Sequence, residues 1–227
     1  MGANEEWLAY REAVKRCTLC GSDVSGRPVP AYFHPSKCEA LLVGFEPEPC
    51  DHKTKQVVCY TGETGNVILD AALRAGLAKH EEVKVKGKKV MKLKLDMRVG
   101  FTTCIKCVTP GRARRKVAKQ CMETFRAREL AIRKPLLIGV LGIPTAKLLL
   151  PNLFSVRKKA GLSLSDYAMV NSFFNEDGVE YLILPNPSDL ISRGKYDTAS
   201  GAFKEFAYGM TLVAEYLEAA EEGTHHA

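Results

Sequence analysis

The sequence predicts an α/β protein, a three-layer αβα sandwich built on a mostly parallel sheet of four strands. Short, continuous apolar runs recur along the chain, and such runs are typical of strands buried on both faces of a parallel sheet. Segments with helical spacing lie between them, which favours a parallel sheet covered by helices on both faces. With 227 residues, 46% of them hydrophobic, the chain can form one sizeable core, so we expect a single domain over residues 1–227.

The first half of the chain supplies a helix, a strand, a second helix and a hairpin. Residues 5–16 (EEWLAYREAVKR) have helical spacing, and residues 40–45 (ALLVGF) form the first apolar strand, which stops at a Glu-Pro-Glu-Pro segment. Residues 66–76 (NVILDAALRAG) have helical spacing and end at a glycine. Residues 83–95 alternate lysine with apolar residues about a glycine, which predicts an inserted basic β-hairpin.

The second half continues the alternation of strands and helices. Strands are expected at 99–105, 136–142 and 181–184, and helices at 116–133, 144–149 and 202–220. Ligands of such sheets bind beyond the carboxyl ends of the strands. Binding residues are therefore expected in the loops that follow Phe45, Ile105 and Leu184.

Basic residues outnumber acidic ones, 33 against 26, for a formal charge of +7. This excess favours polyanions such as nucleic acid, although a soluble basic protein without such a partner would have the same composition. No apolar run reaches the roughly 20 residues that cross a bilayer, and the charged N-terminus is helix-like rather than a signal peptide. We expect a soluble, cytoplasmic protein with no membrane association.

The eight cysteines of the chain include two CxxC pairs, Cys17 with Cys20 and Cys104 with Cys107, followed by Cys121. In a reducing cytoplasm, clustered cysteines more often bind metal than form disulfides. Two such pairs suit a tetrahedral zinc site, and four thiolates suit a [4Fe-4S] cluster equally well, so the spacing does not choose between them. Buried cysteines without a ligand are the third alternative. We assign three others to that class: Cys38, Cys50 and Cys59.

Several short motifs follow one another in a recognisable order. They are the first CxxC pair, GFEPE at 44–48, CYTGETG at 59–65, TCIKC at 103–107, Cys121, LG at 141–142 and PNPS at 185–188. This order resembles that of the uracil-DNA glycosylase superfamily, above all its iron–sulfur members, known as family 4. The resemblance covers the chain from Cys17 to Arg193.

The resemblance implies a cluster that ties the N-terminal segment to the body of the protein and has a structural role. It leaves Cys104 over. The implied ligands are Cys17, Cys20, Cys107 and Cys121.

Glycosidic hydrolysis requires a site that holds a flipped base, stabilises the charge leaving on it and places a water near the anomeric carbon. By position in the motifs, Glu46 is the candidate carboxylate, with an exposed loop glutamate as the alternative reading, and Asn186 is the second candidate catalytic residue. Tyr60 stands where the family has the phenylalanine that stacks on uracil, unless it is a core aromatic. The other residues expected to contact the base are Gly44, Phe45, Pro47, Gly62 and Thr103.

Contacts with DNA are expected from a basic run and from the last motif. Arginines before and at the start of a helix suit phosphates, although a solvated helix start would look the same. Leu190 and Ile191 could wedge into the duplex or simply pack beneath their loop. The expected DNA-contacting residues are Arg112, Arg114, Arg115, Ser188, Leu190, Ile191 and Arg193.

Three positions depart from the family pattern: Phe45 replaces the first-motif glutamate, Thr103 the base-reading asparagine, and Asn186 the second-motif histidine. The last motif instead resembles the NPSGLSR-type loop of the mismatch-specific branch. A pocket built for one base rejects others, so altered polar groups predict an altered base. We expect uracil or, preferably, a modified pyrimidine of the kind found in viral DNA, which would suit an antiviral defence enzyme or a phage factor.

Three functions follow as alternatives. The first is a DNA glycosylase acting on single- or double-stranded DNA, and the second is a catalytically inactive module that binds modified or damaged DNA through the same pocket. The third is a zinc-stabilised nucleotide-binding protein, which would be colourless where an iron–sulfur protein is brown. In each case we expect a monomer of prokaryotic or viral origin without an obligate protein partner.

Overall fold

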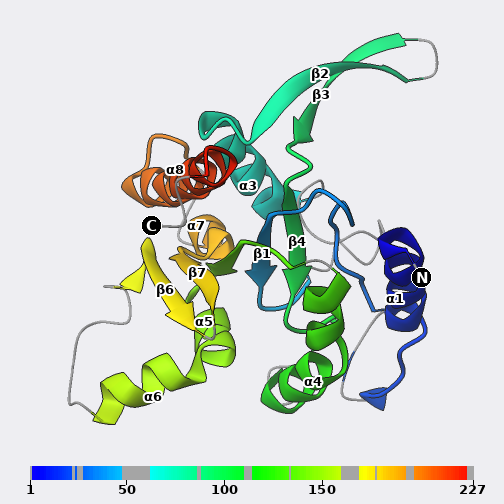
Figure 1. Cartoon of the computed structure of the whole chain (residues 1–227). Coiled ribbons are helices and arrows are strands. Elements are labelled where there is room, and N and C mark those ends of the chain that lie inside the picture. Colours follow the sequence, from blue (N-terminus) through cyan, green and yellow to red (C-terminus); the bar gives the residue numbers. More distant parts are fainter. Residues whose placement is uncertain are drawn as a thin grey trace.

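The computed structural model describes residues 2–21, 24, 28–47, 62–85, 88–109, 114–132, 134–159, 169–176, 178–192 and 197–223. Its centre is a five-stranded sheet in the order β4-β1-β5-β7-β6 (Figure 1). The strands are β1 (Ala40–Gly44), β4 (Val99–Thr103), β5 (Leu137–Leu141), β6 (Ser172–Glu176) and β7 (Val179–Leu184). Neighbours pair in parallel except β6, which is antiparallel to β7. The structure confirms an α/β fold with a mostly parallel central sheet.

The expected number of four strands is wrong because it omits the edge strand β6. The five residues of β6 (SFFNE) alternate between half-buried and exposed positions and include an asparagine and a glutamate. Such a short, half-polar run lacks the burial of the other four strands, in which most or all residues are buried. It is held in place from outside its own sequence, because the turn containing Gly178 (φ 76°) brings it alongside β7.

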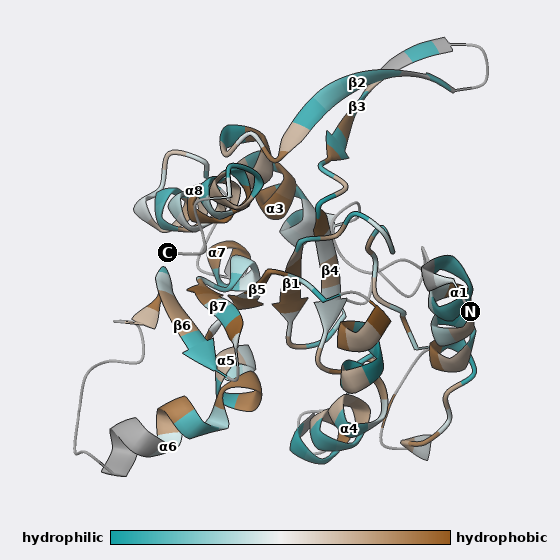
Figure 2. Cartoon of the chain, viewed as in Figure 1, coloured by the Kyte–Doolittle hydropathy of each residue, from teal (hydrophilic) through white to brown (hydrophobic). Residues whose placement is uncertain are grey.

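Helices cover both faces of this sheet. They are α1 (Ala3–Lys15), α3 (Gly62–Arg74), α4 (Arg114–Ile132), α5 (Ile143–Leu149), α6 (Pro151–Lys159), α7 (Pro187–Ser192) and α8 (Gly201–Glu221). Leu42 of β1 belongs to the core shared with α3 and α8, whereas Leu41 and Val43 belong to the core shared with α1, α4 and α5. Because both faces of β1 are buried, its sequence is an unbroken apolar run. Figure 2 shows these apolar strands between the two groups of helices.

Two helices were not expected from the sequence. The helix expected at 144–149 is followed directly by α6, whose first residue, Pro151, suits the first turn of a helix. The short helix α7 begins within the PNPS motif at Pro187 for the same reason. No helix in the described ranges is long and apolar enough to cross a membrane.

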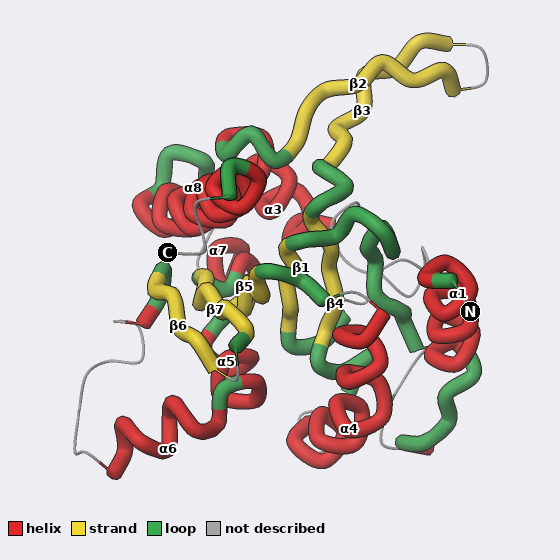
Figure 3. The backbone as a smooth tube through the Cα atoms, in the orientation of Figure 1, coloured by secondary structure: helices red, strands yellow, loops and turns green. Residues whose placement is uncertain are grey.

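An antiparallel hairpin, β2 (Ala78–Val85) with β3 (Lys88–Leu95), projects from the body of the protein (Figures 1 and 3). The pairing starts at Ala78, earlier than the expected range of 83–95, because Ala78 lies opposite Leu95 and both are buried in the core. The hairpin leads into the first residue of β4. The last residue of β4, Thr103, lies at the other end of the strand, where the largest concentration of motif residues is found.

Candidate base pocket and cysteine cavity

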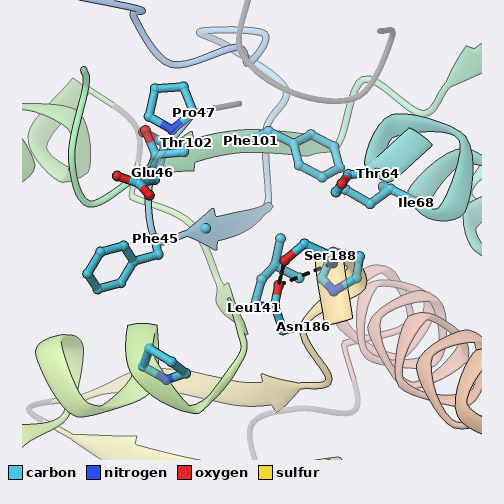
Figure 4. Close-up of a pocket in the computed structure, with 14 residues that line it drawn as sticks. Phe45, Glu46, Pro47, Thr64, Ile68, Phe101, Thr102, Leu141, Asn186 and Ser188 are labelled. Atoms are coloured by element: carbon cyan, nitrogen blue, oxygen red, sulfur yellow. Dashed lines mark hydrogen bonds between the residues drawn. The ribbon is translucent and has the colours of Figure 1, made fainter. Parts of the chain in front are cut away.

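A pocket of about 390 Å³ lies where β1, β4 and β5 end and where the chain leaves β7 (Figure 4). This is the edge at which the parallel sheet was expected to bind its ligand. Seven residues singled out in the sequence line it: Gly44, Phe45, Glu46, Pro47, Thr103, Asn186 and Ser188. The motifs that follow β1, β4 and β7 therefore meet in one cavity.

The loop after β1 is held by the loop after β4. The backbone N–H of Cys104 donates to the carbonyl of Gly44 (2.9 Å), and that of Ile105 donates to the carbonyl of Phe45 (3.0 Å). The Phe45 side chain packs against a small apolar cluster that contains Ile105 and Val117. Figure 4 shows its ring directed away from the Phe101 side of the pocket.

The next residue, Glu46, is the carboxylate that lines the pocket. Glu46 is half-buried, and its Oε2 atom is fully buried. Figure 4 shows the carboxylate beside Thr102 and Pro47. Glu46 thus combines features of both readings, since it lines the pocket and remains partly exposed.

Thr103 lines the pocket but has already committed its hydroxyl proton. Its Oγ1 donates to the carbonyl of Ile105 (2.6 Å), and the residue is only 2% exposed. The hydroxyl can therefore accept a hydrogen bond but has no second proton to donate. An asparagine amide could both donate a hydrogen bond to a base and accept one from it, whereas Thr103 in this arrangement can only accept.

Asn186 holds the start of α7 in place. Its Oδ1 accepts from the backbone N–H (3.3 Å) and the hydroxyl (2.9 Å) of Ser188, and its Nδ2 donates to Asp189 Oδ1 (3.1 Å). These bonds make Asn186 the cap of the helix that follows. Asn186 and Ser188 both line the pocket, where Ser188 was expected to contact DNA instead, and the amide and the hydroxyl are both engaged within their own loop.

Gly142 leaves β5 with φ 87° and supports this loop, because a Cβ added there would lie 2.8 Å from the Cβ of Asn186. We expect Gly142→Ala to lower the free energy of unfolding, measured by urea denaturation, by more than Gly178→Ala does. Both variants carry the strain of a non-glycine residue at positive φ, about 1–3 kcal/mol, but at Gly178 (φ 76°) no described residue comes within 4 Å of an added Cβ. Equal losses in the two variants would show that the contact with Asn186 is unimportant.

The remaining expected contacts are distributed unevenly. Gly62 begins α3 with φ 82°, a conformation that favours glycine, and Arg115 is exposed on the first turn of α4. Leu190 and Ile191 are half-buried and pack against the core formed with α3 and α8. Tyr60, Arg112 and Arg193 lie outside the described residues, as does the side chain of Arg114.

The pocket also has walls that the sequence did not indicate. Thr64 and Ile68, four residues apart on α3, face it together, and the ring of Phe101 lies beside them (Figure 4). The helical spacing of Thr64 and Ile68, directly after Gly62, was a usable signal. Phe101, 1% exposed, gives this cavity an aromatic ring within the described part of the chain.

A second cavity, of about 230 Å³, is lined by Cys17, Cys20, Cys107 and Cys121. Burial first, and the neighbouring thiols of Cys121, Cys20 and Cys17 next, raise the pKa of Cys107 to about 12. Burial also raises the pKa of Cys121 to about 11. Among the described residues, no group of three or more His, Cys, Asp or Glu side chains is arranged to hold a metal ion.

The fifth cysteine of the two CxxC pairs and Cys121, Cys104, does not line this cavity. It is 3% exposed and lies in the apolar core shared with α1, α4 and α5. Burial raises its pKa to about 11. Cys121 belongs to the same core, so Cys104 lies near the cysteine cavity without lining it.

The structure also contains a buried ion pair that the sequence did not indicate. Lys106 Nζ lies 2.5 Å from Glu129 Oε1, and both side chains are 2% exposed. The hydroxyls of Tyr10 and Thr102 donate to the same carboxylate oxygen. Burial and the adjacent Glu129 raise the pKa of Tyr10. Lys106 was visible as part of the TCIKC motif, but its partner on α4 was not.

A family model described as the uracil DNA glycosylase superfamily matches residues 30–207. This range includes the pocket and two of the cavity cysteines, Cys107 and Cys121. A search of curated proteins gives no match.

Proposed function

The chain belongs to the uracil-DNA glycosylase superfamily, and on that premise we propose that it flips a base out of DNA and hydrolyses its glycosidic bond. The observation that carries this proposal is the position of Glu46, a carboxylate in the pocket where the β1, β4 and β7 loops meet. A pocket at the carboxyl ends of parallel strands, lined mainly by apolar groups with a few polar ones, suits a flipped base.

In the proposed reaction, the bond between the anomeric carbon and the base nitrogen breaks and its electron pair leaves with the base. The sugar becomes positively charged, and a water oxygen bonds to it while its proton passes to the Glu46 carboxylate. Glu46 would thus orient the water and stabilise the cationic sugar.

We further propose that the substrate is a modified pyrimidine, with uracil as the alternative. The donor of Thr103 and the amide of Asn186 are engaged within their loops, so the pocket reads a plain uracil edge poorly. Ile68, Phe101 and Leu141 contribute apolar walls. A volume of about 390 Å³ falls in the range of roughly 300–1,000 Å³ that accommodates small-molecule ligands, which leaves space for a substituent on the base. Decorated pyrimidines of viral DNA, and hence antiviral defence, are the corresponding biological setting.

Base release is the experiment that tests this function. Anaerobically purified protein is incubated with oligonucleotides that carry uracil, mismatched thymine, or hydroxymethylated or glucosylated pyrimidines, in single and double strands, and abasic sites are then cleaved with alkali. We expect cleavage at a modified pyrimidine. Cleavage at uracil alone would contradict the proposed modified pyrimidine. No cleavage at any base would contradict the proposed glycosylase activity.

A catalytically inactive DNA-binding module is the second candidate. The engagement of Asn186 with Ser188 and Asp189 favours it, because these groups hold each other rather than face a reaction. Such a module would bind one of the same oligonucleotides tightly, by fluorescence anisotropy, without releasing its base. The third alternative, a zinc-stabilised nucleotide-binding protein, would do neither.

For the cysteine cavity we propose an iron–sulfur cluster of the four-iron type, with zinc as the alternative. Four thiols around one cavity are a suitable donor set for either group. The resemblance to the iron–sulfur members of the superfamily is the reason for preferring the cluster. When bound, the cluster would join α1, the loop after β4 and α4, which is a structural role.

The proposed partner is DNA, and we propose a cytoplasmic monomer. Arg115→Ala should weaken DNA binding and reduce the slope of log K against log salt by about one, the loss expected for one phosphate contact. Lys92→Ala, on the exposed hairpin at the other end of β4, removes the same charge and should leave the slope unchanged. Titrations by fluorescence anisotropy at several salt concentrations measure both. Equal changes would mean that bound DNA extends to the hairpin.

A further inference from the structure

The ammonium of Lys106 lies between the two cavities. All three of its protons have acceptors, because Nζ lies 2.5 Å from Glu129 Oε1, 2.6 Å from Thr102 Oγ1 and 2.7 Å from the carbonyl of Thr103. Thr102 and Thr103 line the base pocket. The same residue, Lys106, lines the cysteine cavity, and its backbone N–H lies 3.4 Å from Cys121 Sγ.

The contact with Thr103 satisfies a group that the sheet leaves open. β4 is the outer strand of the sheet, and Phe101 directs its backbone N–H and carbonyl outward to Tyr32. Alternate residues of a strand direct these groups to the same side, so Thr103 faces the same outer edge. The Tyr32 bridge ends before Thr103, and Lys106 supplies the donor there. An outward carbonyl at the end of an edge strand is thus fixed by a side chain.

Glu129 connects this contact to the N-terminal helix. Its Oε1 accepts from Thr102 (2.9 Å) and from the hydroxyl of Tyr10 on α1, and α1 leads to Cys17. One buried carboxylate oxygen therefore joins α1, β4 and α4. A buried ion pair is a weak source of stability, because an apolar pair of similar volume is often as stable or more so. The Lys106–Glu129 pair instead makes directional hydrogen bonds that an apolar pair cannot make, and these fix the positions of the groups that it contacts.

We propose that Lys106 is a positioning residue that fixes the Thr102–Thr103 wall of the base pocket relative to the cysteine cavity. This inference rests on the proposed function for its consequence, because a wall displaced by about 1 Å can slow a reaction by about 10²-fold. The contacts themselves do not depend on that function. Perturbation at Cys121 then reaches the pocket through Lys106.

Two neutral double variants separate position from stability. Lys106→Met with Glu129→Leu removes the charges and the hydrogen bonds, whereas Lys106→Gln with Glu129→Gln removes the charges and keeps donors. Amide hydrogen exchange by mass spectrometry is followed for residues 99–107 and, as an internal reference, for β7. We expect about 10-fold faster exchange at residues 102–105 in the Met/Leu variant. We expect a change below about threefold in the Gln/Gln variant, with β7 unchanged in both.

A matched control neutralises an exposed pair on the hairpin. Lys94 and Glu81 lie 3.0 Å apart and are 47% and 41% exposed, so Lys94→Gln with Glu81→Gln should not alter exchange at residues 102–105. If Met/Leu does not fold, Thr102→Val removes one acceptor of the ammonium without changing shape, and exchange at Thr103 should still rise. Unchanged exchange in the folded Met/Leu variant, or equal rises in both double variants, overturns the positioning role.

The same variants are then assayed for base release. Positioning predicts a fall in kcat of about 10²-fold for Met/Leu, with a smaller change in KM and partial recovery in Gln/Gln. If wild-type protein releases no base, the proposed function fails while the exchange data still decide the role of Lys106. If base release is normal in Met/Leu, the positioning role fails and the proposed function stands.

Discussion

Replacing Glu46 by glutamine is expected to slow base release by about 10²- to 10⁴-fold, the contribution of a well-placed acid–base group. Glutamine keeps the size of the side chain but loses the negative charge and the ability to take a proton. The Glu46 side chain lines the pocket, with its Oε2 buried, so the lost charge is close to where the cationic sugar would form. Single-turnover rates on the substrate found for the wild type measure this effect.

Glu63→Gln is the matched control, because Glu63 is an exposed carboxylate on the first turn of α3 and does not line the pocket. Its rate should stay within about twofold of the wild type, since surface substitutions away from the site have small effects. The DNA dissociation constant of Glu46→Gln should change by less than about threefold. A full rate in Glu46→Gln would assign the role to one of the next carboxylates along the chain, Glu48 or Asp51, which lie outside the described residues.

The same substitution distinguishes the two leading functions. In an inactive binding module, Glu46→Gln has no rate to lose, and removing a negative charge near DNA should leave affinity equal or slightly higher. In an enzyme, the same substitution should lower the rate of base release and leave the affinity for DNA nearly unchanged. The measurement thus bears on the function as well as on the residue.

Most of the fold could be predicted because four strands are buried on both faces. β1, β4 and β5 are buried or nearly so along their whole length, and β7 over its last four residues, so their sequences are rich in apolar residues, as is typical of a parallel core. β6 was not predicted, because a partly exposed edge strand is specified by its neighbour rather than by its own composition. Helix α6 escaped because its residues are half-exposed or exposed where described and show little periodicity.

The sequence predicted which residues would lie at the site, but it did not predict their hydrogen-bond partners. Motif order brought Glu46, Thr103 and Asn186 to one pocket. It could not show that Asn186 is held by Ser188 and Asp189, because those bonds depend on the side-chain rotamers of one turn. Neither could it show Lys106 paired with Glu129, since that pair forms only when α4 packs against β4. Long-range polar pairing leaves no periodic trace in a single sequence.

Replacing Cys107 by serine is the second change with a large expected effect. If the cavity binds an iron–sulfur cluster, the variant should be colourless, contain little iron and unfold at a lower temperature. Loss of a structural metal belongs to the rare changes above about 4 kcal/mol, which corresponds to a fall in Tm of roughly 8–16 °C for a chain of this size. Iron and zinc analysis, visible absorption and thermal unfolding measure the three consequences. A colourless wild type containing zinc would establish the alternative metal.

Cys104→Ala is the control for this experiment. Cys104 is buried three residues before Cys107 but does not line the cavity. Its replacement should cost about 1 kcal/mol, as for a typical point substitution, and leave the metal content unchanged. Equal metal loss in Cys104→Ala and Cys107→Ser would contradict the assignment of ligands.

The single tryptophan of the chain adds a local readout of what the cavity does. Trp7 is 7% exposed on α1, and its ring lies 4.1 Å from Phe33 and 5.4 Å from Tyr10, measured between centroids. If the cluster ties α1 to the body through Cys17 and Cys20, Cys107→Ser should expose Trp7 and shift its emission to longer wavelength, whereas Cys104→Ala should not. Unchanged emission with lost iron would mean that the apolar packing of Trp7 and Tyr10 holds α1 by itself. In that case the role of the cluster would be confined to the loop after β4, where Lys106 and Cys107 are adjacent.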